Sequence, residues 1–177
     1  EFFHPGSKSD RNEKNTLYEW VLINEQQKLT RLYSMDVSSV FCGEDVCKVD
    51  RVKLFWDELG QYKSYSLADG VSLEKGNGLD FDAEDYRKLD IILSKKNSGL
   101  KGLNKTELVQ PQSSGNGADA LTGATIALDK TDYIEEAIWT CYTLWHFANG
   151  DISQIIQNIT GQKTSSIQLK QLLINGD

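Results

Sequence analysis

Seven consecutive residues combine small side chains, two hydroxyl groups and a carboxylate in a way that suits an anionic ligand. They read Asp119-Ala120-Leu121-Thr122-Gly123-Ala124-Thr125. Gly123 has no Cβ and Ala124 adds only a methyl group, so a phosphate could approach the backbone N–H groups of a turn at this point. The hydroxyl of Thr122 can donate a further hydrogen bond. The same residues would also suit a plain polar loop in which Thr122 or Thr125 caps a helix.

This stretch resembles the Asp-x-x-(Ser/Thr)-Gly-Ala-Thr signature of FMN-binding domains, such as the flavin-carrying subunits of sodium-pumping quinone reductases and of Rnf electron-transfer complexes. From average residue usage, the five fixed positions would match by chance roughly once in a few thousand chains of this length. In that family, a separate Mg-dependent flavin transferase joins the hydroxyl of the last Thr to the phosphate of FMN. The resemblance therefore implies that Thr125 carries FMN covalently. It implies a phosphate environment made by Gly123, Ala124 and Thr122. The side chain of Asp119 would either hydrogen-bond the backbone two residues on and so close the loop, or be recognised by the transferase and its metal during attachment.

A weaker resemblance to these domains extends over about Val40 to Gly150, where a hairpin, a connecting helix and the motif follow in a similar order. It implies an α+β, FMN-binding-domain-like fold in which an antiparallel sheet packs against helices. The chain would then be a redox carrier rather than a stand-alone catalyst, with no catalytic residue and an unidentified electron donor and acceptor. Because such transferases work mainly outside the cytoplasm in bacteria, the resemblance also implies a periplasmic or cell-surface location.

An alternative hypothesis is a binding or scaffold module that has the same fold and carries no flavin. It predicts that Trp139 and Trp145 are partly exposed in a contiguous apolar patch. A hydrolase is not indicated, because neither His4 nor His146 forms a recognisable Ser-His or Cys-His arrangement.

Length and charge limit the possible partners. The 177 residues favour one main domain, and we expect a disordered tail over 1–15, the FMN-binding-like domain over 16–150 and a helical extension over 151–177. With 26 acidic and 19 basic residues and no basic cluster, the net charge of −7 argues against nucleic acid as a partner. No apolar run approaches the roughly 20 residues that cross a bilayer, so we expect no membrane insertion within this chain.

The cysteines could mark an oxidising compartment. Cys42 and Cys47 are separated by four residues, so a disulfide between them is possible, although two free thiols are equally compatible with the sequence. A zinc site is less favoured, because Cys141 and His146 lie five residues apart, a poor match to the usual ligand spacing. No metal ligands are therefore predicted.

Local patterns predict the elements that would position the motif. The apolar residues of Thr16–Tyr33 fit a helix, although Trp20–Ile23 could instead be a buried strand. Alternation over Cys47–Leu67 predicts a β-hairpin that turns at Asp57–Gly60. Its aromatic residues, which are Phe55, Trp56, Tyr62 and Tyr65, are expected to form cross-strand core pairs rather than a flavin platform.

Capping signals predict the helices. Asp82 with Asp85 forms a capping box, and Phe81 can pack against Tyr86 as a hydrophobic staple. Five further segments are expected, namely a short turn capped by Asn104 and Glu107, a polar loop over 110–117, a helix capped by Asp132 and Glu135 that runs to Ala148, and two short helices over 152–159 and 167–174.

The predicted helix that ends at Ala148 is apolar on two faces. Its main stripe consists of Ile134, Ala137, Ile138, Cys141, Leu144, Trp145 and Ala148. The second face carries Trp139, Tyr142, Thr143 and His146, which could line a flavin ring but more often belong to a core. We expect the core role.

Overall fold

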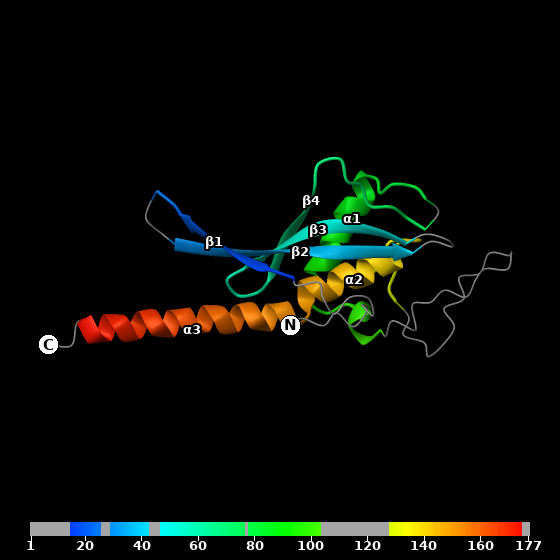
Figure 1. The fold of residues 1–177 in the computed structure, drawn as a ribbon. Coiled ribbons are helices and arrows are strands. Elements are labelled where there is room, and N and C mark those ends of the chain that lie inside the picture. The colour runs from blue at the N-terminus through cyan, green and yellow to red at the C-terminus, as the bar shows by residue number, and fades with distance from the viewer. Residues whose placement is uncertain (1–14, 26–28, 43–46, 77, 104–127, 175–177) are drawn as a thin grey trace.

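The computed structural model describes residues 15–25, 29–42, 47–76, 78–103 and 128–174. The elements in chain order are β1 (Leu17–Ile23), β2 (Leu29–Cys42), β3 (Cys47–Asp57), β4 (Tyr62–Leu67), α1 (Ala83–Ser94), the 3-10 helix η1 (Gly99–Gly102), α2 (Ile138–Asn149) and α3 (Asp151–Ile174). The strands form one antiparallel sheet in the order β1-β2-β3-β4. Helices α1 and α2 pack against this sheet, and α3 continues along the side of β1 and β2 (Figure 1). The α+β fold class predicted from the sequence is confirmed.

The core lies between one face of the sheet and the helices. Side chains alternate between the two faces of a strand, and the inward set is fully buried. That set consists of Tyr33, Met35 and Val37 in β2 and of Val52, Leu54 and Trp56 in β3. The indole N–H of Trp56 donates to the backbone carbonyl of Ala148 at 2.8 Å, which ties the sheet to the end of α2.

The predicted helix over Thr16–Tyr33 is wrong, because this segment contains β1 and the start of β2. Trp20 lies opposite Leu32 and Ile23 lies opposite Leu29, so cross-strand pairing overrides the weak helical pattern. The alternative of a strand at Trp20–Ile23 is right in type, but the strand is exposed rather than buried, since β1 lies at the edge of the sheet.

The β3–β4 hairpin is confirmed. The carboxylate of Asp57 accepts backbone hydrogen bonds from Leu59 at 3.0 Å and from Gln61 at 2.9 Å, which closes the turn. Gly60 adopts a φ of 68°, a conformation that costs little only for glycine. Trp56 faces Tyr62 across the strands.

Helix α1 begins as predicted. Asp82 accepts from the backbone N–H groups of Glu84 and Asp85, and the side chain of Asp85 accepts from the N–H of Asp82. The rings of Phe81 and Tyr86 pack with centroids 5.5 Å apart. Both capping signals are local, so they do not depend on the rest of the fold.

The second predicted capping box does not form. Helix α2 begins at Ile138 after Ala137, which makes no side-chain capping bond, and Asp132 is used elsewhere. The helix ends at Asn149 with Gly150 as its C-cap, one residue beyond the predicted end at Ala148. A positive φ of 59° at Glu136 instead turns the chain just before the helix.

The two short helices predicted at the C-terminal end are one continuous helix, α3. A glycine inside a helix costs only about 1 kcal/mol relative to alanine, so Gly161 need not break it. Contacts hold the helix on both sides of this glycine, because Thr160 bonds the Tyr33 hydroxyl and Lys163 pairs with Glu19. Within the described ranges, no helix combines the length and apolar character needed to cross a lipid bilayer.

Candidate functional site

The predicted attachment residues lie outside the described part of the chain. This applies to Asp119, Thr122, Gly123, Ala124 and Thr125, and also to the capped turn at 104–107 and the loop at 110–117. The structure does describe the residues on either side of this segment. These residues are Leu103 and Leu128.

The departing end is fixed to α2 through η1. The hydroxyl of Ser98 accepts from the N–H of Leu100 at 3.2 Å and so starts η1. Leu100 and Leu103 are both buried in the core. The hydroxyl of Tyr142 donates to the carbonyl of Leu103 at 3.3 Å, which fastens the last described residue before the motif segment.

The returning end is fixed to the same 3-10 helix. Asp132 accepts from the N–H of Gly99 at 3.0 Å and from the ammonium group of Lys95 at 3.0 Å, an arrangement that we name the Asp132 junction. The same ammonium group also donates to the carbonyl of Thr131 at 3.0 Å. Gly99 allows a close approach, because a Cβ there would lie 2.9 Å from a methyl group of Leu128. The two ends of the motif segment therefore meet at η1.

An aromatic row on α2 lies beside this meeting point. Ring centroids are 6.3 Å apart between Trp139 and Tyr142 and 4.3 Å apart between Tyr142 and His146. Nε2 of His146 lies 3.2 Å from the carbonyl of Leu100, an acceptor, so this nitrogen carries the proton. Burial lowers the pKa of His146, and the hydrogen bond to Leu100 opposes that shift. The imidazole is therefore neutral at physiological pH.

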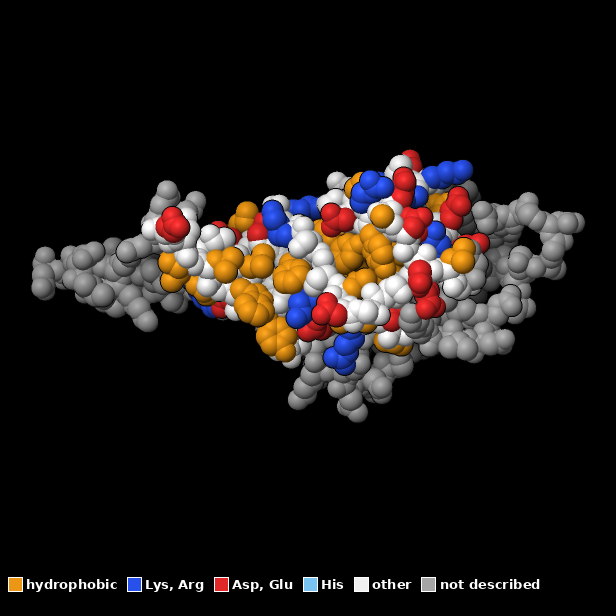
Figure 2. All heavy atoms as spheres, turned by 90° about the horizontal axis from the view of Figure 1, so that it is seen from above, with side chains coloured by type: hydrophobic (Ala, Val, Ile, Leu, Met, Phe, Trp, Pro, Cys, Tyr) orange, Lys and Arg blue, Asp and Glu red, His pale blue; other side chains and the backbone are white. Residues whose placement is uncertain are grey.

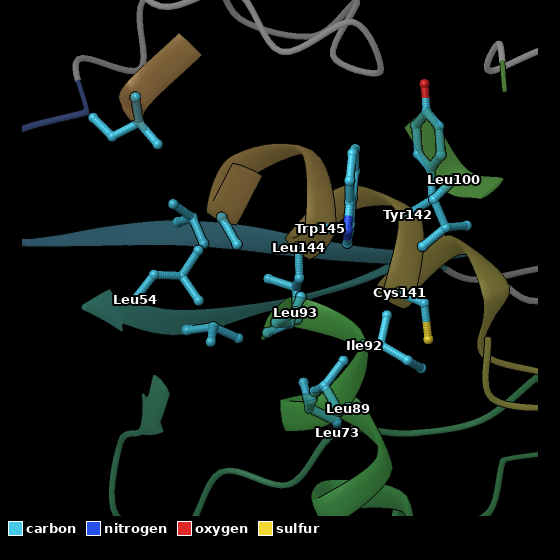
Figure 3. Close-up of a cluster of buried hydrophobic side chains, with 14 of the residues drawn as sticks. Leu54, Leu73, Leu89, Ile92, Leu93, Leu100, Cys141, Tyr142, Leu144 and Trp145 are labelled. Atoms are coloured by element: carbon cyan, nitrogen blue, oxygen red, sulfur yellow. The ribbon is translucent and has the colours of Figure 1, made fainter. Parts of the chain in front are cut away.

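Burial separates the members of this row. Tyr142 is 1% exposed, which confirms the predicted core role, whereas Trp139 and His146 are only partly buried. Figure 3 shows Cys141 and Leu144 of α2 pointing toward α1, while Tyr142 points the other way, beside Leu100. Among the rings considered for a flavin neighbour, Tyr142 is thus engaged in the core.

The patch expected for a scaffold module is not present as predicted. Trp145 is 2% exposed, and its indole donates to the carbonyl of Lys95 at 2.7 Å. Trp139 is partly exposed, as that hypothesis required. A surface centred on both tryptophans is therefore excluded.

The cysteine predictions have different outcomes. Cys42 and Cys47 are opposed in the register of β2 and β3, but their side chains are not among those described, so the disulfide and the two free thiols stay alternatives. Cys141 is a buried free thiol, and burial raises its pKa to about 12. The described residues contain no group of three His, Cys, Asp or Glu side chains that could hold a metal ion.

The Asp132 junction was missed in the sequence because Lys95 and Asp132 are 37 residues apart and form no local pattern. A scan against protein-family models, a search of curated proteins and a search of solved structures found no match to the chain. The functional assignment therefore depends on the motif and on the surroundings of its two anchored ends.

Proposed function

We propose that the chain is an electron-transfer domain that carries FMN through a phosphoester on Thr125, outside the cytoplasm. The observation that carries this proposal is the heptapeptide Asp-Ala-Leu-Thr-Gly-Ala-Thr at 119–125. A flavin transferase would be the maturation partner, and separate redox proteins would supply and accept the electrons. The α+β architecture is compatible with this role but does not by itself indicate it.

The anchored ends of the motif segment support the proposal. Thr125 is three residues before Leu128, and three residues of chain span at most about 11 Å. A group attached to Thr125 would therefore be tethered close to η1 and the Asp132 junction, which are held by buried residues. A covalent tether of this kind keeps the cofactor at a high effective concentration beside the domain.

The residue types of the motif suit a phosphoester. The backbone around Gly123 and Ala124 can donate N–H groups to phosphate oxygens, and the hydroxyl of Thr122 can add another donor. Trp139 and His146 are the partly exposed rings on the aromatic row, so they are the side chains best suited to contact an attached flavin. When bound, FMN would supply the redox chemistry, while these residues would position it and exclude water.

The test is co-expression of the chain with a flavin transferase, followed by intact-mass measurement and in-gel flavin fluorescence. We expect a mass increase equal to FMN less one water, located on the peptide that contains Thr125. Thr125→Val should abolish the adduct, whereas Thr125→Ser should keep some of it because a hydroxyl is retained.

Thr106→Val is the matched control, because it removes the same hydroxyl from the same segment outside the motif. It should leave the adduct unchanged. Absence of an adduct on the parent protein, or an adduct that survives Thr125→Val, would overturn the proposal and leave the scaffold-module hypothesis.

A further inference from the structure

Strand β1 and the facing part of β2 form an arm that reaches past the sheet's other two strands (Figure 1). Large apolar side chains on this arm are about half exposed or more, and together we name them the arm patch. They are Tyr18 (48%), Trp20 (49%), Val21 (51%), Leu22 (55%), Ile23 (69%) and Leu29 (50%). Such a concentration is unusual on the surface of a monomer and marks an interaction site.

Among the described residues, helix α3 holds the inner face of the arm. Glu19 of β1 pairs with Lys163 of α3, and the hydroxyl of Tyr33 bonds Thr160 of the same helix. Tyr18, Trp20 and Leu22 alternate with Glu19 along β1, so they point to the opposite, outer face. Figure 2 shows hydrophobic side chains gathered along the arm on the upper face of the molecule.

The edge of β1 lacks the features by which proteins discourage strand pairing. The strand Leu17–Ile23 contains no proline and only one charged residue, Glu19. The carboxylate of Glu19 is already neutralised by Lys163 and by Arg31, whose Nε lies 3.6 Å away. In the described residues, β1 pairs with β2 and has no strand on its other side. A strand added there would meet apolar side chains and free backbone groups.

We infer that the occupant of this edge is β1 of a second copy, paired antiparallel about a two-fold axis at Trp20. The two sheets would then join into one. Two-fold pairing is self-consistent only when a strand complements itself, and β1 does. Trp20 would face Trp20 of the second copy, and Tyr18 would face Leu22. On the inner face Glu19 would face Val21, so two like charges are not opposed.

The area of the arm patch indicates a weak dimer. Aromatic side chains offer about 150–250 Å² each, and aliphatic ones somewhat less, so the half-exposed side chains that the arm patch has in β1 itself present about 400 Å² per copy. The dimer would bury about 800 Å², which is below the roughly 1,200–2,000 Å² of stable interfaces and in the range of weak, transient ones. The net charge of −7 on each copy adds repulsion at low salt. Association should therefore depend on concentration and strengthen when salt is raised.

Sedimentation velocity on the full chain tests this inference. Over a roughly 100-fold range of concentration around the micromolar affinities of such small interfaces, we expect a monomer–dimer equilibrium. Leu22→Lys should weaken the dimer roughly 10–100-fold, since both copies lose an apolar contact and gain a charge. Leu59→Lys is the matched control, because Leu59 is 57% exposed in the β3–β4 turn. It should leave the equilibrium unchanged.

Trp20→Cys tests the position of the axis. Residues directly opposed in an antiparallel pair have Cα atoms about 4.5–5.5 Å apart, within the range of a disulfide. Mild oxidation should therefore give a covalent dimer linked through position 20, identified by peptide mapping, and Leu59→Cys should not. A parent that stays monomeric at every concentration, or a dimer that tolerates Leu22→Lys, would overturn the inference.

Discussion

Replacing Asp132 distinguishes two roles that this residue could have. As the first residue of a capping box, Asp132 would act with Glu135 to start a helix, and serine would replace it with little loss because serine is an equally good N-cap. As the Asp132 junction, it bonds Gly99 and Lys95 across the fold. Serine has one oxygen on a shorter side chain, so it cannot bond both Gly99 and Lys95. We therefore expect Asp132→Ser to be destabilising and Glu135→Ala to be nearly neutral.

The size of the effect follows from the groups left behind. Asp132 is 8% exposed, and its loss leaves the N–H of Gly99 without an acceptor, which costs about 1–3 kcal/mol. The partner Lys95 is 30% exposed and keeps its bonds to Thr131, so loss of the ion pair adds only about 0.5–1 kcal/mol. Asp132→Ala should thus lower the free energy of unfolding by about 2–4 kcal/mol. In a chain of this length, that corresponds to a decrease in Tm of about 5–12 °C.

The assay is urea denaturation followed by circular dichroism and by tryptophan fluorescence, on the parent, Asp132→Ala, Asp132→Ser and Glu135→Ala. Glu135 is exposed, and α2 begins three residues after it, so its replacement should change the stability by less than about 0.5 kcal/mol. If Asp132→Ser were as stable as the parent while Glu135→Ala lost about 1 kcal/mol, the capping box would be real and the junction would be wrong.

Three further outcomes are expected. Gly60→Ala should lower the free energy of unfolding, measured in urea, by about 3 kcal/mol or more, because it combines a φ of 68° with a clash against a backbone carbonyl of α3. Gly70→Ala, at a φ of 77° in open space, should lower it by only about 1–2 kcal/mol. Equal losses for the two variants would refute this. Cys141 should resist alkylation at pH 8 in the native protein and react in urea, as peptide mapping would show, because burial raises its pKa to about 12; rapid native labelling would contradict its burial. Hydrogen bonds from the backbone N–H groups of Asp85 and, to a smaller extent, Glu84 lower the pKa of Asp82. The charged carboxylate of Asp82 therefore stabilises the fold above its unfolded-state pKa, and this stabilisation is lost as the pH falls. The Tm advantage of the parent over Asp82→Asn should accordingly be largest at neutral pH and shrink below about pH 4, and an advantage that grew in acid would contradict this assignment.

Elements with local signals were predictable from the sequence. The β3–β4 hairpin depends on strict alternation and on a turn closed by Asp57 and Gly60, all within a few residues of one another. The start of α1 depends on Asp82, Asp85 and their own backbone. In both cases the interacting groups are neighbours in the chain, so distant residues do not alter the outcome.

Elements whose signals are ambiguous needed the whole fold. Trp20 and Leu32 fit a helical period and a strand equally well, and pairing of β1 with β2 decided for the strand. The predicted break between 159 and 167 is absent, because contacts at Thr160 and Lys163 hold this part of α3 against β2 and β1. Asp132 has the sequence context of a helix cap, but its side chain instead bonds Lys95 and Gly99, which are distant in the sequence.

The sequence by itself determined the hairpin, the first helix and the motif that suggests a flavin at Thr125, since each is written in residues close together along the chain. The α+β class was implied by the resemblance over about Val40 to Gly150. Only the tertiary structure decided that the residues flanking the motif segment meet at η1, that Trp139 and His146 stay partly exposed, and that β1 is an apolar edge. These features arise from contacts between residues tens of positions apart. Whether such contacts form depends on how all the elements pack, which no local pattern specifies.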